Sequence, residues 1–317
     1  MRAKEIFLKN FRNEMWFGKC IFLSWYCEKG SCKFCYRSVN RSEKTSRRSL
    51  ASVLVEAFLC KKFKWKLEFL TGGYGIYDFD ELVDIVKKVK EVYGEKIWLN
   101  LGVLNKEEIE RFKPYIKGIV ASIETVNEKL HKEICPKKPI EPYEDMLRNC
   151  SLKKSITIII GLGENEGDKE ELFKFIEKYK LDRITFYALK PIEGTIFKKG
   201  PESKYYASWI RDTRIRFPEL EIIAGITPRR VDDVCLLLDA GANAITKFPI
   251  TKEFNTEKSR KFEEEVKKSG RKLLSKLNGQ VKIDFKEIDG FSFDKKLKEE
   301  MKEKLGFYLK RMKQKSF

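Results

Sequence analysis

The chain has 317 residues, of which 66 are Lys or Arg and 48 are Asp or Glu, so its formal net charge is +18. Because 42% of its residues are hydrophobic, it can form a packed interior, which excludes a disordered protein. No apolar run reaches the roughly 18 residues that a membrane span needs, and the first residues lack the apolar core of a signal peptide. We therefore expect a cytoplasmic globular protein without a membrane segment.

Short apolar runs alternate with segments of helical periodicity along most of the chain. The runs are rich in Ile, Val, Leu and Phe, as is typical of parallel strands buried on both faces. They lie at 21–26, 67–71, 96–101, 119–123, 155–161, 183–189, 221–226 and 244–249. The helical segments lie at 49–63, 79–93, 106–112, 143–150, 169–179, 204–215 and 231–239.

Eight strands alternating with helices predict an α/β fold of the (β/α)8 barrel type. An open, doubly wound sheet is the alternative, but the Gly-x-Gly-x-x-Gly loop that would support it does not follow the first run. After residue 250 the alternation stops. Two long helical segments, 258–277 and 294–312, flank a predicted short strand at 281–288. We therefore expect a barrel domain of residues 1–250 and a C-terminal helical extension of residues 251–317 that caps it.

The positive charge is dispersed along the chain. Lys alternates with Glu in segments such as 87–91 and 263–268, which is typical of an ion-paired thermophile surface. An anionic partner or substrate is the alternative. Arg and aromatic residues are not gathered in one stripe, so we do not expect nucleic-acid binding.

Three of the eight cysteines are clustered after the first predicted strand, with the spacing Cys27-x4-Cys32-x2-Cys35. Three thiolates on one loop can hold three irons of a [4Fe–4S] cluster and leave the fourth iron open. Structural zinc, the alternative, normally has four ligands, and no fourth Cys or His stands at finger or ribbon spacing. A loop after a barrel strand lies on the face where barrel enzymes have their active sites.

The remaining cysteines are scattered, and disulfides are not expected in a cytoplasmic chain. We predict that they are buried thiols: Cys20, Cys60, Cys135, Cys150 and Cys235. Cys20 precedes the predicted first strand, so we expect it at the opposite end of the barrel. His131, the single histidine, is predicted to be an exposed, non-functional helix residue.

The cysteine motif, with aromatic Phe34 before its last cysteine, resembles that of the radical S-adenosylmethionine (SAM) superfamily. The resemblance covers roughly residues 15–250. The common motif has three residues between its first two cysteines, and this chain has four. This longer spacing restricts the number of subfamilies that the chain can resemble. The resemblance implies a [4Fe–4S] cluster on Cys27, Cys32 and Cys35, with SAM as the second cofactor.

Further strand ends resemble SAM-binding stretches, in the order expected for the biotin synthase-like subgroup. Thr71-Gly72-Gly73-Tyr74-Gly75 resembles a Gly-Gly-Glu motif that binds the methionyl amino group, with Tyr74 in place of the acid. Adjacent glycines permit close backbone approach, although a simple turn is the alternative. The resemblance also assigns contacts with the ribose or amino acid part of SAM to Glu124, and adenine-side contacts to Ile160, Gly161, Tyr187 and Leu189.

The resemblance implies that an external electron donor drives cleavage of SAM to methionine and a 5′-deoxyadenosyl radical, which takes a hydrogen atom from a small molecule. Substrate contacts are expected from strand ends that SAM does not occupy: Asn100, Arg229, Arg230 and Lys247. Each cation could anchor a carboxylate or phosphate, or equally form a rim ion pair. We expect an acidic substrate, and structural roles for Arg214 and Arg216.

Within the subgroup, the motifs resemble biotin synthase, the [FeFe]-hydrogenase maturase HydE and two archaeal-type families. We favour the family that acts in biosynthesis of the iron-guanylylpyridinol cofactor of [Fe]-hydrogenase (HcgA, also called HmdB), which has a lengthened first cysteine gap. The alternative is a component of a two-protein lipoyl synthase. Sulfur insertion normally draws on a second cluster, and no second cysteine set is visible, so a partner protein would have to supply the sulfur. A non-enzymatic iron–sulfur electron carrier is the remote alternative.

Overall fold

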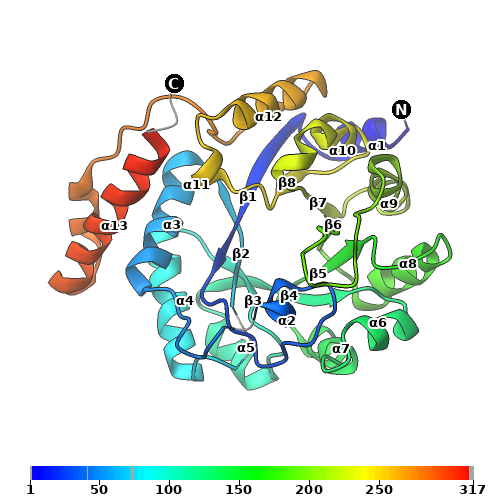
Figure 1. The fold of residues 1–317 in the computed structure, drawn as a ribbon, viewed down its shortest axis with the longest axis horizontal. Coiled ribbons are helices and arrows are strands. Elements are labelled where there is room, and N and C mark those ends of the chain that lie inside the picture. The colour runs from blue at the N-terminus through cyan, green and yellow to red at the C-terminus, as the bar shows by residue number, and fades with distance from the viewer. Residues whose placement is uncertain (1, 41, 73–74, 314–317) are drawn as a thin grey trace.

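The structure is a computed structural model that describes residues 2–40, 42–72 and 75–313. In these residues each strand pairs in parallel with the next, and the first strand also pairs with the eighth, which closes the barrel (Figure 1). The barrel strands are β1 (Glu14–Phe22), β2 (Lys66–Thr71), β3 (Ile97–Asn100), β4 (Ile116–Glu124), β5 (Lys153–Ile160), β6 (Arg183–Ala188), β7 (Glu221–Gly225) and β8 (Ala244–Thr246). The predicted (β/α)8 barrel is confirmed.

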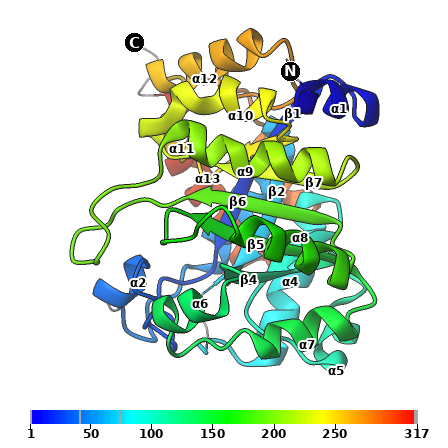
Figure 2. The same cartoon turned by 90° about the vertical axis from the view of Figure 1, so that its right-hand side faces the viewer.

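Helices surround the barrel and cover its outer surface (Figure 2). They are α3 (Leu50–Phe63), α4 (Phe79–Tyr93), α5 (Lys106–Phe112), α6 (Glu128–Ile134), α7 (Glu141–Asn149), α8 (Asp168–Tyr179), α9 (Ser203–Arg216) and α10 (Val234–Asp239). Several begin at a side-chain cap, as where Asn105 and Glu108 form a reciprocal capping box at the start of α5. The sequence did not predict α1 (Arg2–Asn10), α2 (Tyr36–Val39) or the 3-10 helix η1 (Pro228–Asp233), which replaces the first part of the predicted helix 231–239.

The first strand is the main error of the sequence prediction. The run 21–26 was expected to form it, whereas β1 covers Glu14–Phe22, and Leu23 is still bonded to β2 through its N–H, which donates to the Thr71 carbonyl at 2.7 Å. Gly18 and Lys19 interrupt the apolar pattern, but the Lys19 side chain points outward to an ion pair with Glu56 and is therefore compatible with a strand. As a consequence, Cys20 lies within the barrel and not at its opposite end.

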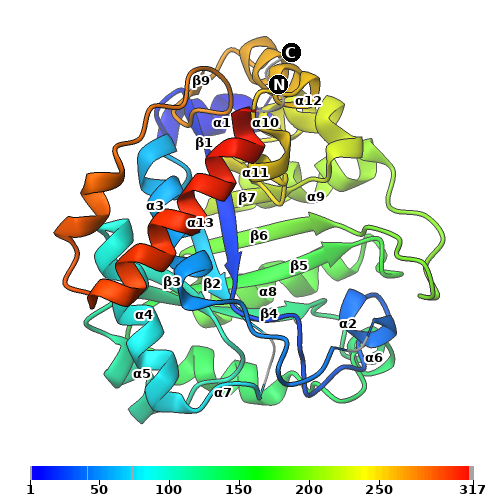
Figure 3. The same cartoon turned by 60° about the vertical axis from the view of Figure 1, so that its left-hand side comes forward.

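The C-terminal segment contains α11 (Ile250–Glu253), α12 (Glu257–Lys268), β9 (Lys272–Leu273), η2 (Phe285–Gly290) and α13 (Lys295–Lys313). The predicted helix 258–277 ends early because Gly270 has φ +78° and the following residues pair with β1 as β9. The short strand predicted at 281–288 is wrong, since η2 occupies its second half. The α13 helix lies along α3 on the outside of the barrel (Figure 3). A division at residue 250 stays a prediction.

The apolar core fills the layer between the barrel and its helices, with fully buried side chains such as Phe58 of α3 and Val89 of α4. Each such side chain contributes about 1.5–3 kcal/mol when it is fully buried. Across the described ranges, no helix is both long and apolar enough to cross a membrane.

Candidate functional site

A cavity of about 640 Å³ lies at the carboxyl ends of the barrel strands. Its volume is within the range of about 300–1,000 Å³ that small-molecule sites occupy. The strand ends that line it include Thr71, Asn100, Glu124, Tyr187 and Lys247. In a (β/α)8 barrel this is the face that carries catalytic residues.

The three clustered cysteines line one wall of this cavity. Their loop is ordered by its own backbone, since the Cys35 N–H donates to the Cys32 carbonyl at 2.9 Å. The Arg37 guanidinium donates to the carbonyls of Ser24 and Trp25 at 2.9 and 3.0 Å, which fixes the loop to the end of β1. Three thiols from one loop around one cavity fit a [4Fe–4S] cluster, in which each thiolate binds a different iron.

The described His, Cys, Asp and Glu side chains contain no group of three around a point where a single metal ion could bind. A cluster does not require such a point, because its ligands bind separate irons. The loop thiols differ in their surroundings, because burial raises the pKa of Cys35, whereas the pKa of Cys32 is lowered. The Cys135 thiol hydrogen-bonds to Cys32 and thereby lowers the pKa of Cys32, against the opposing effect of burial. A lowered pKa favours the thiolate, which is the metal-binding form.

Cys135 is a neighbour that the sequence did not reveal, since it is separated from the loop by the whole first half of the barrel. It is buried at the end of α6 in a small apolar cluster that also contains Ile134 and Leu189. Cys32 and Phe34 pack against this cluster from the loop. Leu189, which was predicted to lie on the adenine side of SAM, thus belongs to the apolar cluster against which the cysteine loop packs.

Glu124 lies at the end of β4 with φ +65° and forms an ion pair with Lys138 at 2.7 Å. Both side chains are 11% exposed and line the cavity. Burial lowers the pKa of Lys138, but the adjacent Glu124 carboxylate more than offsets this, so the pKa lies above its ordinary value. The structure therefore places a charged pair at the position predicted for Glu124. Lys138, which follows α6, was missed because nothing local to it indicates a site.

The remaining predicted SAM contacts are divided between the cavity wall and the layer behind it. Gly72 and Phe34 line the cavity, whereas Gly73 and Tyr74 are outside the described residues. Ile160 is fully buried behind the strand, and its neighbour Ile159 lines the cavity. Gly161 has φ +106°, and a Cβ there would lie 2.9 Å from Pro201 Cδ, so this turn requires glycine.

The four substrate candidates have different surroundings. Asn100 lines the cavity and accepts a hydrogen bond from the Ser122 hydroxyl at 3.0 Å. Arg229 is exposed in η1, and Arg230 pairs with Asp233 at 2.7 Å. Neither of these arginines is among the described lining residues.

Lys247 follows β8 with φ +65°, and its ammonium lies 4.9 Å from the ring centroid of Tyr187. The side chain is accessible to solvent within the cavity, although the barrel wall surrounds it. The surrounding protein removes part of the water around the ammonium group, which lowers the pKa of Lys247. In the part of the chain that the structure describes, no carboxylate forms an ion pair with Lys247.

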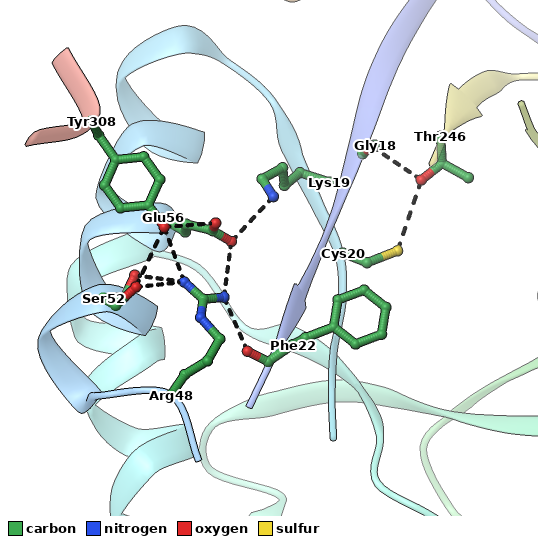
Figure 4. A network of polar contacts seen from close by, with 9 residues as sticks. All are labelled: Gly18, Lys19, Cys20, Phe22, Arg48, Ser52, Glu56, Thr246 and Tyr308. Carbon is green, nitrogen blue, oxygen red and sulfur yellow. Dashed lines mark hydrogen bonds and ion pairs between the residues drawn. The ribbon is translucent and has the colours of Figure 1, made fainter. Parts of the chain in front are cut away.

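Cations outnumber carboxylates around the cavity. Among the described lining residues, Glu56 and Glu124 carry the negative charges, and the cations are Lys19, Lys29, Arg37, Arg48, Lys138, Lys247, Lys252 and Arg311. Glu56 is shared by Lys19 at 3.1 Å and Arg48 at 3.3 Å, and it also accepts a hydrogen bond from the Tyr308 hydroxyl of α13 (Figure 4). The cavity is therefore electropositive.

A polar layer lies directly below the cavity. Glu68 of β2 is fully buried and accepts hydrogen bonds from Cys20 at 2.9 Å, Tyr187 at 3.0 Å and Thr185 at 3.1 Å, as well as from Thr246. Glu68 was not predicted as a site residue, although a lone acid inside the apolar run 67–71 could have indicated an inward-facing charge.

The structural predictions for other residues had mixed outcomes. Arg214 is buried and donates to Asn243 at 2.6 Å, in agreement with a structural role, and Arg216 forms a surface ion pair with Glu177. The prediction that His131 is exposed is wrong. It is 2% exposed because it lies on the same face of α6 as buried Ile134.

The cysteines outside the loop do not assemble into a second set within the described ranges. Cys60, Cys135 and Cys150 are buried as predicted, whereas Cys20 and Cys235 are partly accessible. Cys20 lies in the barrel and Cys135 beside the loop, and the others lie on separate helices or helix ends.

A closed parallel barrel with three cysteines on one loop at its catalytic face is typical of a class of iron–sulfur enzymes. The similarity of this chain to known proteins agrees with that class. Residues 25–176 match the family described as "Radical SAM superfamily". This match covers just under half of the chain and includes the cysteine loop, so the chain resembles the radical SAM superfamily, whose members normally bind a [4Fe–4S] cluster and SAM.

Among its relatives, the chain is 40% identical to "Uncharacterized protein MJ0597" of Methanocaldococcus jannaschii, over 86% of this chain and 78% of that one. It is 26% identical to the biotin synthase of Methanococcus vannielii, over 57% of each chain. Among solved structures, methylornithine synthase (PylB) superposes with a TM-score of 0.66 at 23% identity, over 77% of this chain and 75% of that one. This structural likeness concerns the fold.

Proposed function

We propose that the chain holds a [4Fe–4S] cluster on Cys27, Cys32 and Cys35 and binds SAM in the adjoining cavity. The observation that carries the proposal is that three thiols of one loop line a single cavity at the carboxyl ends of the strands. When they are bound, the cluster and SAM supply a 5′-deoxyadenosyl radical that removes a hydrogen atom from a substrate.

The chain's own residues position the reactants. The backbone after β2, at Gly72, offers close approach to a polar group of SAM, and the carboxylate of Glu124 can accept hydrogen bonds from it. Lys138 keeps Glu124 in place at 2.7 Å. The apolar side chains of Phe34 and Ile159 line the same cavity and would shield bound SAM from water.

The proposed substrate is a small anionic molecule. Lys247 extends into an electropositive cavity without an ion-pair partner among the described residues, so a carboxylate or phosphate of the substrate would complete its surroundings. Asn100, at the end of β3, is the second candidate contact.

For the pathway, we favour biosynthesis of the iron-guanylylpyridinol cofactor of [Fe]-hydrogenase, in which a partner protein of the same pathway and an external electron donor would take part. The lengthened first cysteine gap supports this proposal. The lipoyl synthase alternative requires a sulfur source, and the described cysteines do not form a second cluster site. Under that alternative a partner protein would bring the sulfur.

The test is anaerobic reconstitution with iron and sulfide, followed by measurement of iron content, the electron paramagnetic resonance (EPR) spectrum of the reduced protein, and 5′-deoxyadenosine formation from SAM. We expect Cys32→Ala to lose the cluster spectrum and at least a hundredfold in 5′-deoxyadenosine formation. Cys235→Ala, on the outer helix α10, is the matched control and should keep both. Full SAM cleavage by Cys32→Ala would refute the cluster assignment.

A further inference from the structure

Cys20 is a fourth cysteine on the surface of the cavity. It lies on β1, inside the barrel, and lines the cavity together with Tyr187 and Lys247. Figure 4 shows it on the side of β1 opposite to Lys19, facing Thr246. Of the cysteines among the described lining residues, it is the one that does not belong to the cluster loop.

The surroundings of Cys20 keep its sulfur protonated. The thiol donates to a Glu68 carboxylate oxygen at 2.9 Å, and Thr246 Oγ1 lies 3.9 Å from the sulfur. Burial and then the charge of Glu68 raise the pKa of Cys20 well above its ordinary value. Cys20 is therefore a neutral thiol at neutral pH, unlike a cluster ligand, which must be a thiolate.

The other donors to Glu68 are hydroxyl groups, from Thr185, Tyr187 and Thr246. A serine at position 20 could make the same hydrogen bond, so the polar layer does not itself require sulfur. What sulfur adds is a weak bond to hydrogen. An S–H bond is weaker than most C–H bonds and far weaker than the O–H bond of an alcohol or water, so a thiol gives a hydrogen atom to a carbon radical and an alcohol does not.

We propose that Cys20 is a catalytic residue that donates a hydrogen atom to the carbon radical of the substrate. This inference rests on the proposed radical SAM function. The S–H bond of Cys20 breaks, a C–H bond forms on the substrate, and the product leaves with all its electrons paired. The unpaired electron remains on the Cys20 sulfur.

The thiol is restored by one electron and one proton. The electron comes from the same external low-potential, one-electron donor that the superfamily chemistry already requires, so each turnover consumes two electrons and one SAM. The proton comes from water in the cavity, because Cys20 is partly accessible on the cavity surface, and the Glu68 carboxylate then accepts the hydrogen bond of the restored thiol. Because the substrate loses one hydrogen atom and regains one, the product is an epimer or a rearranged isomer.

The first test needs no substrate. The reconstituted holoprotein is given SAM and titanium(III) citrate in thiol-free D2O, and the 5′-deoxyadenosine is analysed by mass spectrometry. Without substrate, the nearest hydrogen donor to the reactive carbon should be Cys20, whose S–H exchanges with D2O. We expect one deuterium in the wild-type product and its loss in Cys20→Ser. Water itself cannot be the donor, since its O–D bond is too strong.

Cys150→Ser is the matched control, because Cys150 is a buried thiol at the end of α7 that is not among the described lining residues of the cavity, and it should retain the deuterium. Iron content and the EPR spectrum must be unchanged in Cys20→Ser, which separates hydrogen donation from cluster loss. Deuterium that persists in Cys20→Ser, or a wild-type product without deuterium, overturns the inference. A wild type that forms no 5′-deoxyadenosine overturns the proposed function instead.

A second readout uses the protein without cluster or SAM. The infrared difference between wild type and Cys20→Ser should contain an S–H stretching band that shifts in D2O and persists through neutral pH. Absence of this band would mean that Cys20 is a thiolate, which cannot give a hydrogen atom, and would overturn the inference.

Discussion

Lys247 and Glu124 are two residues at which backbone strain and charge coincide. Both have φ +65°, and neither ends a helix or is a glycine. A non-glycine residue in this region costs on the order of 1–3 kcal/mol and persists where its surroundings impose it. The other described non-glycine residues with positive φ are the helix caps Lys64 and Lys180, where this conformation is common, and Asn255, a residue type that adopts it readily. The strain that neither capping nor residue type explains therefore occurs at the cavity.

At the residue scale, we predict that Lys247→Met increases stability at pH 7 while abolishing productive use of an anionic substrate. The folded protein lowers the pKa of Lys247, so protonation of this lysine opposes folding. Because the side chain is exposed to solvent in the cavity, screening keeps this effect small, and removal of the charge should raise the free energy of unfolding by less than about 1 kcal/mol. The gain should shrink as pH rises toward the ordinary lysine pKa of about 10.4, because wild type then loses the same charge.

Urea unfolding of the protein without cofactors at pH 7 and pH 10 measures this difference. SAM cleavage without substrate should be unchanged in Lys247→Met, because Lys247 is assigned to the substrate and not to SAM. A variant that is clearly less stable than wild type at pH 7 would contradict the assignment of Lys247 as a cation without a partner.

At the scale of elements, one buried carboxylate connects β1, α3 and α13 beside the cavity. Glu56 of α3 is 7% exposed and faces Lys19 of β1, Arg48 and Tyr308 of α13 (Figure 4). Arg48 also donates to the Phe22 carbonyl at 3.0 Å, at the end of β1 just before the cysteine loop. The position of the C-terminal helix is thus coupled to the strand that carries Cys20.

We predict that Glu56→Gln destabilises the fold by about 3–5 kcal/mol, because it leaves buried cations without their counter-charge. Tyr308→Phe, which removes one hydrogen bond of the same network, should cost about 1 kcal/mol. Urea unfolding of both variants measures the two values. If both substitutions lowered the free energy of unfolding equally, the charge of Glu56 would not be the dominant contribution of this network to stability.

The pH dependence of the same network has a definite sign. Burial raises the pKa of Glu56, but Lys19 and Arg48 more than offset this, so its pKa lies below the ordinary value. A carboxyl with a lowered folded pKa stabilises the protein above the unfolded pKa of about 4.3 and loses this contribution as pH falls through the folded pKa. We expect the stability difference between wild type and Glu56→Gln to be full at pH 6 and to shrink below pH 4. A difference that stayed constant down to acid unfolding would contradict this assignment.

At the scale of the whole molecule, the charge of +18 is distributed over two environments. On the surface, many lysines pair with carboxylates three or four residues away, such as Lys174 with Glu171 and Lys88 with Asp84. Around the cavity, cations outnumber carboxylates. This distribution supports the proposed small anionic ligand over an extended polyanion.

We predict that duplex DNA binds weakly and without saturation at a defined site, with a dissociation constant no tighter than about 10⁻⁴–10⁻⁶ M at physiological salt. Fluorescence anisotropy with a labelled duplex between 50 and 500 mM NaCl measures this. Binding that persists at 500 mM NaCl would indicate a nucleic-acid surface and contradict the prediction.

The amino-acid sequence by itself determined the barrel, because alternating apolar strands and amphipathic helices leave few other ways to bury their faces. It also determined the cysteine loop, since Cys27, Cys32 and Cys35 are close in sequence and their spacing constrains where their thiols can lie. The cavity positions of Asn100, Glu124, Tyr187 and Lys247 followed from the rule that parallel strands end on one face.

Only the tertiary structure decided contacts between distant segments. Cys135 beside Cys32, Lys138 beside Glu124 and Glu68 beneath Cys20 join residues on different elements, and no local pattern encodes such pairs. The start of β1 was also decided this way, because the outward pairing of Lys19 with Glu56 makes a charged residue compatible with a buried strand. Because β1 includes position 20, Cys20 lies on the cavity and not at the far end of the barrel. There burial and the Glu68 carboxylate raise the pKa of its thiol.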